Sequence, residues 1–518
     1  MKRREITPDA RPGGRSKVFV GAAVCACLLS TAGYAEDPYH SNIRSRFAKD
    51  IDKVELQPGL VIEPRIESAL MFVGNINLAQ DAEDEVDVAG IEAAPGIYAT
   101  YLSTRAQAAL DYTFIGRVFE DSDYNDVSHR LAANGSYTVL PEWFFVRGQA
   151  SYTDTIIDPA LGYNYGGSGL FNQTNLAEVA SAMVEPAMHH QFQHVAVDAR
   201  YSYGRVWYLD SPDAPPSNFF TSYNDDAENQ RAYLSLNTID PDAAASARAY
   251  YEWQASDFEN SIPYRYERVG AEIGLQLVES LRLVGDGGLE SDLDEDTTDG
   301  GLDTAFWHAG FQWRPDSRTL LDARYGERFF GESWSLELQR DTRWISLRAS
   351  YIEDPEVETR RLNADFEPGG LPLPDPNDGF SFFSSFPYVR KDATASIIAT
   401  GARTKLRLDL YDRKREFLNI FPPDETTQGV RFNALRDLGT ASLYLELDAR
   451  YDDIERGRRT LDVTDTRVVH DYDTEAMLRL SWEAYRNFVA SAEAGYLTRS
   501  GDRVYDGEWL AFRLSYTF

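Results

Sequence analysis

The sequence predicts an all-β fold, a transmembrane antiparallel β-barrel of about 22 strands, and any even number from about 18 to 24 fits the pattern. Three observations predict it. From Leu60 onward, segments of about ten residues alternate apolar and polar side chains. No apolar stretch after Leu29 reaches the roughly 20 residues that a membrane helix needs. The chain also ends on a strand-like segment, Leu510 to Phe518. Because only helices and closed sheets satisfy every backbone group in lipid, we expect a closed sheet.

The first 35 residues are expected to be a cleaved signal peptide. A basic leader up to Lys17 precedes a short apolar run, Val18 to Leu29, and Gly33-Tyr34-Ala35 places small residues at the cleavage positions. The run is too short to span a bilayer as a helix. Residues 36–59 are then a short periplasmic tail, too short for a plug domain, and residues 60–518 form the barrel.

Cysteine usage and charge exclude several classes of function. Cys25 and Cys27 both lie in the predicted signal peptide, so the mature chain would have no disulfide, thiolate metal site or cysteine nucleophile. Cleavage removes six basic and two acidic side chains, which takes the formal net charge from −32 to −36. This acidity argues against nucleic acid, which is bound by neutralising phosphates with Lys and Arg.

One hairpin shows the strand pattern clearly. Between residues 128 and 139 the odd positions from Leu131 to Val139 are apolar or glycine, and the second segment, 143–154, alternates in the same way. Pro141 lacks a backbone donor and therefore belongs in the turn. Trp143 and Tyr152 lie where aromatic girdles are expected.

The connections are expected to alternate between short periplasmic turns and longer extracellular loops. The longer ones carry much of the acid, in 81–87, 120–126, 290–303 and 365–378. The connection 327–333 is short where a long one is due.

With apolar side chains facing lipid, the alternate positions line the lumen with charges of both signs. These could be an interlocked solvated lining, a hydrophilic passage that binds hydroxyls and carboxylates, or both. The predicted lumen-lining residues are Arg105, Asp111, Arg200, Arg248, Glu252, Arg268, Glu272, Arg324, Arg407, Asp409, Glu446, Arg450 and Arg479.

A barrel of about 22 strands is wide enough that we expect a loop to fold inward. The candidate is 352–392, whose Pro and Gly residues preclude a regular strand and whose phenylalanines need cover. A mobile external loop is the alternative. The candidate gating residues are Pro368, Gly369, Gly370, Phe380, Phe382, Phe383 and Phe386.

The last strand carries a C-terminal assembly signal in Leu514, Tyr516 and Phe518. This ending resembles the closing strand of Gram-negative outer-membrane barrels. The resemblance implies the cell outer membrane as location, with lipid, lipopolysaccharide and the barrel assembly machinery as partners.

Residues that would indicate catalysis are missing. His189, His190 and His194 form a cluster near a predicted turn, but no acidic residue completes a metal-ligand spacing. No nucleophile elbow or phosphate-binding glycine loop occurs. The sequence therefore predicts no enzyme, no cofactor and no metal site.

The first barrel segment, from about Ile62 to Asp158, resembles the uncharacterised outer-membrane proteins associated with the PEP-CTERM sorting and exopolysaccharide system. The motifs that carry the resemblance are Pro64-Arg65-Ile66-Glu67, 75–79, 94–97, Asp111-Tyr112 leading to 125–131, and Leu140-Pro141-Glu142-Trp143. The later chain shows only a barrel of suitable length. The resemblance implies a link to exopolysaccharide biosynthesis and supplies no binding residues.

Three functional hypotheses follow. The leading one is an exit conduit, or part of one, for a secreted polysaccharide, with the polymer and periplasmic export components as partners. The first alternative is a general porin or uptake channel for small polar solutes. The second is a structural barrel whose acidic loops bind polymer or divalent cations.

Overall fold

The computed structural model is a closed antiparallel barrel of 22 strands, which confirms the predicted fold class and strand number. It describes residues 59–156, 171, 176–210, 225–238, 243–259, 263–293, 301–357, 359, 387–418, 424–439, 442–459, 466–485, 487–502 and 504–518. The predicted signal peptide and nearly all of the predicted periplasmic tail lie outside these residues. None of the described helical segments is long and apolar enough to cross a membrane.

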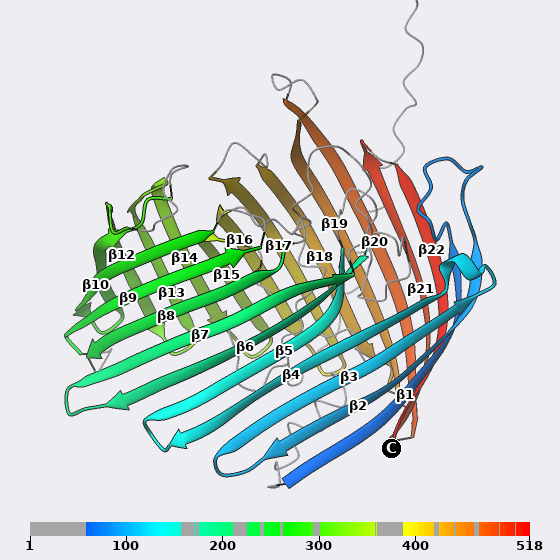
Figure 1. Cartoon of the computed structure of the whole chain (residues 1–518), viewed down its shortest axis with the longest axis horizontal. Helices are drawn as coiled ribbons and strands as arrows, with labels where there is room; N and C mark the ends of the chain where they lie inside the picture. The colour runs from blue at the N-terminus through cyan, green and yellow to red at the C-terminus, as the bar shows by residue number, and fades with distance from the viewer. Residues whose placement is uncertain are drawn as a thin grey trace, which may run out of the picture.

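The strands follow one another around the wall in chain order, each hydrogen-bonded to the one before and the one after, and β1 pairs with β22 to close the sheet (Figure 1). Their bounds are β1 Gly59–Gly74, β2 Val88–Leu102, β3 Ala106–Phe119, β4 Asp126–Leu140, β5 Phe144–Ile156, β6 Leu176–Gln191, β7 Val195–Asp210, β8 Ala227–Thr238, β9 Ala245–Phe258, β10 Tyr264–Val278, β11 Leu281–Glu290, β12 Thr304–Asp316, β13 Thr319–Arg328, β14 Gly331–Asp341, β15 Ile345–Glu356, β16 Tyr388–Thr400, β17 Thr404–Phe417, β18 Glu425–Asp437, β19 Leu443–Arg459, β20 Thr466–Tyr485, β21 Phe488–Gly501 and β22 Tyr505–Thr517.

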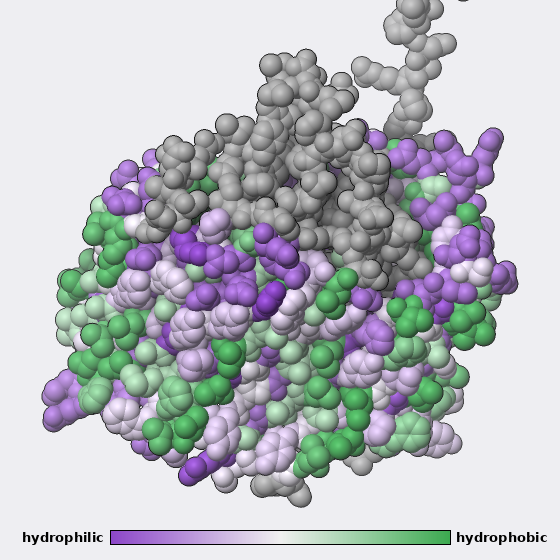
Figure 2. Space-filling model, in the orientation of Figure 1, coloured by the Kyte–Doolittle hydropathy of each residue, from purple (hydrophilic) through white to green (hydrophobic). Residues whose placement is uncertain are grey.

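The two faces of the wall differ as the alternation predicts. On β22, Phe512 and Leu514 are 47% and 50% exposed, whereas Ala511 between Leu510 and Phe512 is fully buried. Successive strand residues point to opposite faces, so the exposed apolar side chains form the outer face and the others point into the barrel. Figure 2 shows hydrophobic residues over the lower part of the visible outer wall and hydrophilic residues nearer the opposite end.

Short and long connections segregate to opposite ends of the barrel. We call the end with the C-terminus and the tight connections the turn end, and the other the loop end. The hairpin between β4 and β5 turns at Pro141 to Trp143, as predicted, with Glu142 at a φ of 64°. At the loop end, the acidic connection between β3 and β4 contains a short 3-10 helix, η1 (Ser122–Tyr124).

The connection between β13 and β14 is the short one at the loop end that the sequence left unexplained. It consists of Phe329 and Phe330 before Gly331, whose φ is 104°. The backbone N–H of Phe329 donates to Glu290 at 2.9 Å, and its ring lies 6.5 Å from that of Tyr266. The turn is thus held down on the inner wall.

We expect Leu336→Arg to destabilise the barrel by about 2–4 kcal/mol, because an outward Arg near mid-membrane meets lipid. Leu336 lies in the middle of β14 and is 38% exposed on the outer face. The measurement is urea unfolding in lipid vesicles. The neighbouring Glu337→Arg, on the inward face, is the matched control and should change stability by less than about 1 kcal/mol. Equal losses in both variants would contradict this assignment of faces.

Candidate functional site

The inward face of the wall carries charged side chains of both signs, many of them in ion pairs. On β13, Arg324 contacts Glu272 of β10 at 2.6 Å and Asp322 of its own strand at 3.0 Å. The predicted lumen residues that lie on inward positions are Asp111, Arg200, Arg248, Glu252, Arg268, Glu272, Arg324, Arg407, Asp409, Glu446, Arg450 and Arg479.

Arg105 is the exception, and its prediction as a lumen residue is corrected. It lies exposed in the turn between β2 and β3, at the turn end. β3 starts only at Ala106 because Ser103 closes the turn before it. The Ser103 Oγ accepts from the N–H of Ala106 at 2.9 Å, and the Ser103 N–H donates to the Ala106 carbonyl at 2.7 Å.

A charge network crosses the seam where the barrel closes. We call it the seam network, and it comprises Arg513, Glu67, Glu92, Arg117 and Asp126. Arg513 of β22 contacts Glu92 of β2 at 2.6 Å and Glu67 of β1 at 3.2 Å. Arg117 of β3 contacts Glu92 and Asp126 of β4, both at 2.9 Å. The network therefore ties the last strand to the first four.

The seam is also closed by backbone hydrogen bonds. The N–H of Phe518, the terminal residue, donates to the carbonyl of Pro64 at 2.9 Å. The side chains of Leu514, Tyr516 and Phe518, the predicted assembly signal, are all exposed on the outer face, and the Tyr516 and Phe518 rings lie 4.9 Å apart. These residues present an apolar ridge beside β1.

A second ion pair lies beside the seam network and uses residues of the motifs that carry the sequence resemblance. Arg65 of β1 contacts Asp111 of β3 at 2.6 Å and also donates to Thr113. The guanidinium lies over Gly96 of β2, where a Cβ would come within 2.7 Å of its Nε. Glycine at this position lets the arginine cross the intervening strand.

The seam network was missed when lumen residues were selected from the sequence. Arg513, Glu67 and Glu92 alternate with apolar outward residues just as the predicted ones do, so the same signal could have found them. What the alternation could not show is which charges meet, because the contacts join strands that are far apart in sequence.

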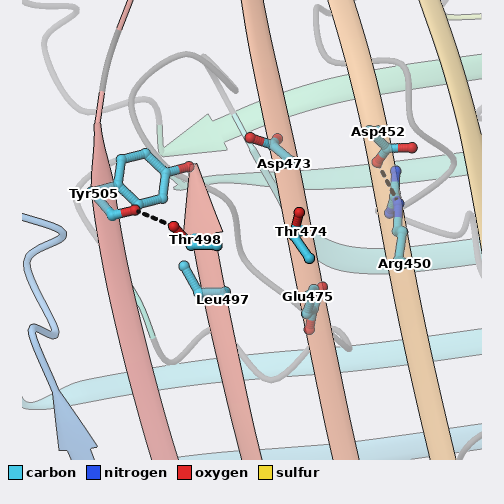
Figure 3. A pocket seen from close by; sticks show the side chains of 8 residues that line it. All are labelled: Arg450, Asp452, Asp473, Thr474, Glu475, Leu497, Thr498 and Tyr505. Carbon is cyan, nitrogen blue, oxygen red and sulfur yellow. Dashed lines mark hydrogen bonds and ion pairs between the residues drawn. The ribbon is translucent and has the colours of Figure 1, made fainter. Parts of the chain in front are cut away.

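The wall formed by β19 to β22 is densely packed and rich in acids (Figure 3). Arg450 contacts Asp452 at 2.5 Å, and Asp452 accepts a hydrogen bond from Tyr411. Arg499 is fully buried and contacts Asp473 at 2.9 Å. The residues around the small pocket in this wall are Arg450, Asp452, Asp473, Thr474, Glu475, Leu497, Thr498 and Tyr505. The pairing of Arg450 and Arg499 with these acids indicates a structural role for the two arginines.

A buried cluster joins four strands, β10, β11, β13 and β15, near the loop end. Arg328 contacts Glu290 at 2.9 Å, donates to Tyr266 at 2.8 Å, and reaches Asp354 at 3.0 Å. Glu290 is fully buried and Arg328 nearly so. An unpaired charge here would be costly, so these groups hold one another in place.

Two connections enter the barrel at residues that the structure describes. After β15, Val357 is fully buried against Tyr264 and Tyr266, and the Thr359 carbonyl accepts from Asn229 of β8 at 3.2 Å. Between β5 and β6, the Phe171 ring lies 5.9 Å from that of Trp509, on the inward face of β22. The start of the predicted inward loop thus contacts the far inner wall.

The predicted gating residues Pro368, Gly369, Gly370, Phe380, Phe382, Phe383 and Phe386 lie outside the described residues. Their place in the lumen stays a prediction.

The histidine cluster lies at the turn end, where β6 passes into β7. His189 contacts Asp198 at 2.5 Å, and the His190 ring stacks on Trp143 with centroids 3.5 Å apart. Across the described ranges, no group of three or more His, Cys, Asp or Glu side chains could hold a metal ion. These contacts account for His189 and His190 structurally.

Comparison with known proteins identifies the fold. No family model and no curated protein matches the chain. Among solved structures, it is similar to the siderophore receptor PirA from Acinetobacter baumannii, with a TM-score of 0.50 and 8% identity over 90% of this chain and 81% of that one. It is also similar to the FrpB iron transporter from Neisseria meningitidis, with a TM-score of 0.52 and 8% identity over 91% and 84%.

The chain therefore shares its barrel fold with these two proteins.

Arg513→Gln is expected to destabilise the folded barrel by about 1–3 kcal/mol, because the buried Glu92 keeps Arg117 but loses its second cation. Urea unfolding in vesicles measures the effect. Arg265→Gln is the matched control: Arg265 pairs with Asp257 on the outer face, where both side chains are more exposed, and should lose about 1 kcal/mol or less. If Arg513→Gln matched this control, the seam network would not stabilise the closure.

Proposed function

We propose that this chain forms a passage for polar solutes across the outer membrane. The observation that carries the proposal is a closed barrel with an apolar outer face and an inward face lined with ion pairs. Such a lining supplies donors and acceptors that replace a solute's hydration. A structural barrel would need the outer face but not exposed inward charges such as those of Arg200 and Glu337.

The passage is narrowed from the loop end. Val357, Thr359 and Phe171 come from connections between strands yet pack on the inner wall. In this proposal the contacts of these three residues hold the two connections against the inner wall, where they narrow the passage. Breaking one of these contacts widens the passage.

Single-channel conductance of the purified barrel in planar bilayers tests the passage. We expect stepwise currents from the native chain and a larger unitary conductance from Val357→Asp, because a carboxylate is expelled from the apolar contacts with Tyr264 and Tyr266. Val504→Asp places the same charge at an exposed loop-end position and should leave conductance unchanged. Absence of current from both the native barrel and Val357→Asp, with each correctly folded, would contradict the proposal.

We further propose an exopolysaccharide as the solute, moving outward. Support comes from the resemblance of residues 62–158 to outer-membrane proteins of the PEP-CTERM exopolysaccharide system. Several residues of those motifs form the ion pairs beside the seam, including Arg65, Glu67 and Asp111. A general porin would use the same lining, and the receptor and transporter folds described above suit uptake equally well.

Deleting the gene should leave cells that make polymer but fail to surface it, measured as capsule-stained surface polymer against total polymer. Unchanged surface polymer would contradict export and leave the porin proposal. Glu83→Gln with Glu85→Gln removes two of the five acidic charges from the exposed loop between β1 and β2 without touching the lumen. Export should survive this change, whereas a barrel that anchors polymer through its acidic loops would lose surface polymer.

A further inference from the structure

Arginine and aromatic side chains alternate along the inward face from β7 to β12. The Arg200 guanidinium lies 5.0 Å from the Tyr233 ring centroid, and that of Arg248 lies 5.8 Å from the same ring. Arg248 also lies 5.3 Å from the Tyr250 ring, and Arg268 lies 5.6 Å from it. Contacts of this kind fix the guanidinium planes without neutralising their charge.

The first two arginines of this row differ from the third. Arg268 contacts Asp286 at 3.2 Å. Arg200 and Arg248 have no carboxylate within ion-pair distance in the part of the chain that the structure describes. Arg248 donates instead to the Tyr233 hydroxyl.

Nearby carboxylates are already engaged by other groups. The pairing of β9 with β10 places Glu272 directly opposite Arg248. Glu272 nevertheless contacts Arg324 at 2.6 Å. Glu252 contacts Arg231 at 2.9 Å. Asp198, on the same strand as Arg200, contacts His189 at 2.5 Å and accepts from Asn237 at 3.1 Å. The positive charge of Arg200 and Arg248 is therefore available to a solute.

Both side chains face the lumen. Tyr233 shares its face of β8 with Ser235, which is buried, while Leu234 and Leu236 on the opposite face are exposed to the outside. Arg200 is paired with Tyr233 in the register and is itself exposed. An exposed arginine on an inward position contacts whatever fills the barrel.

We propose that Arg200, Tyr233 and Arg248 form a binding subsite for a carboxylated sugar unit. A guanidinium recognises a carboxylate through paired N–H donors, and an aromatic ring offers an apolar face to the C–H face of a sugar. Two guanidiniums beside one ring can contact the carboxylate and hydroxyls of one uronate residue. The subsite deepens the proposed function, on which it rests, by naming an acidic saccharide as the solute.

The test is calorimetric titration of the full barrel in detergent with trigalacturonate, and with maltotriose as the uncharged probe. The native chain should bind trigalacturonate at least about tenfold more tightly than maltotriose. Arg200→Gln with Arg248→Gln should weaken trigalacturonate binding about tenfold or more, since charge-assisted hydrogen bonds are lost. Equal affinity for trigalacturonate in the native and variant chains would overturn the subsite. Displacement of trigalacturonate by an equal concentration of sulfate would also overturn it, because the site would then bind anions without recognising the sugar.

Two further variants separate binding from folding and from overall charge. Arg205→Gln with Arg265→Gln removes the same charge from the outer face, where these arginines pair with Glu228 and Asp257, and should leave the affinity unchanged. Arg200→Lys with Arg248→Lys keeps the charge but not the planar fork and should bind with intermediate affinity. Loss of binding in the outer-face variant would overturn the assignment to the lumen.

The same barrels in planar bilayers distinguish this inference from the proposed passage. Current that trigalacturonate blocks in the native chain and not in Arg200→Gln with Arg248→Gln supports both. Current without any effect of trigalacturonate overturns the subsite and leaves the passage. Binding without current supports the subsite and contradicts the passage.

Discussion

Closure of the sheet by the pairing of β22 with β1 is the constraint on which the rest of the structure depends. An open edge would leave backbone groups unpaired in lipid, which only a closed barrel avoids. Where the outer face contacts lipid, it tolerates only apolar side chains. The charged side chains at that level of the wall must therefore lie inside. There the charges need counter-charges. Arg513 supplies a positive charge to the carboxylates of both β1 and β2. Closure of the sheet therefore explains the charges of both signs inside the barrel as much as the binding of a solute does.

The interior is not uniform. Near the seam and along β19 to β22, arginines such as Arg117 and Arg499 are buried against carboxylates. Along β7 to β12, rings lie against glycine instead. A Cβ on Gly270 would come within 2.7 Å of the Tyr250 ring and 2.9 Å of the Phe306 ring, so glycine allows both rings to lie flat on the wall. The side near the seam is thus braced by buried ion pairs, while the side from β7 to β12 combines ion pairs such as Arg268–Asp286 with rings and with the arginines Arg200 and Arg248.

Much of this could be predicted from the sequence, because alternation with a period of two is a local property. It located both segments of the hairpin around Pro141 and the outward face of β22, which the structure confirms. Arg105 was misplaced because a hydroxyl in the turn, that of Ser103, decides where β3 begins. The partners of each charge could not be predicted. Glu290 and Arg328 lie on β11 and β13, which β12 separates, and alternation within one strand cannot show which charges meet across it.

The seam network has a consequence for the order in which the barrel can be completed. Glu67 and Glu92 are among the first residues of the barrel, whereas Arg513, which contacts both, lies five residues before the last residue, Phe518. Until the last strand arrives, the opening hairpin holds carboxylates that lack this cation. A chain truncated before Arg513 would leave Glu92 with Arg117 alone and Glu67 without the Arg513 contact. The final strand thus brings the cation that completes the seam network at the moment when it closes the sheet.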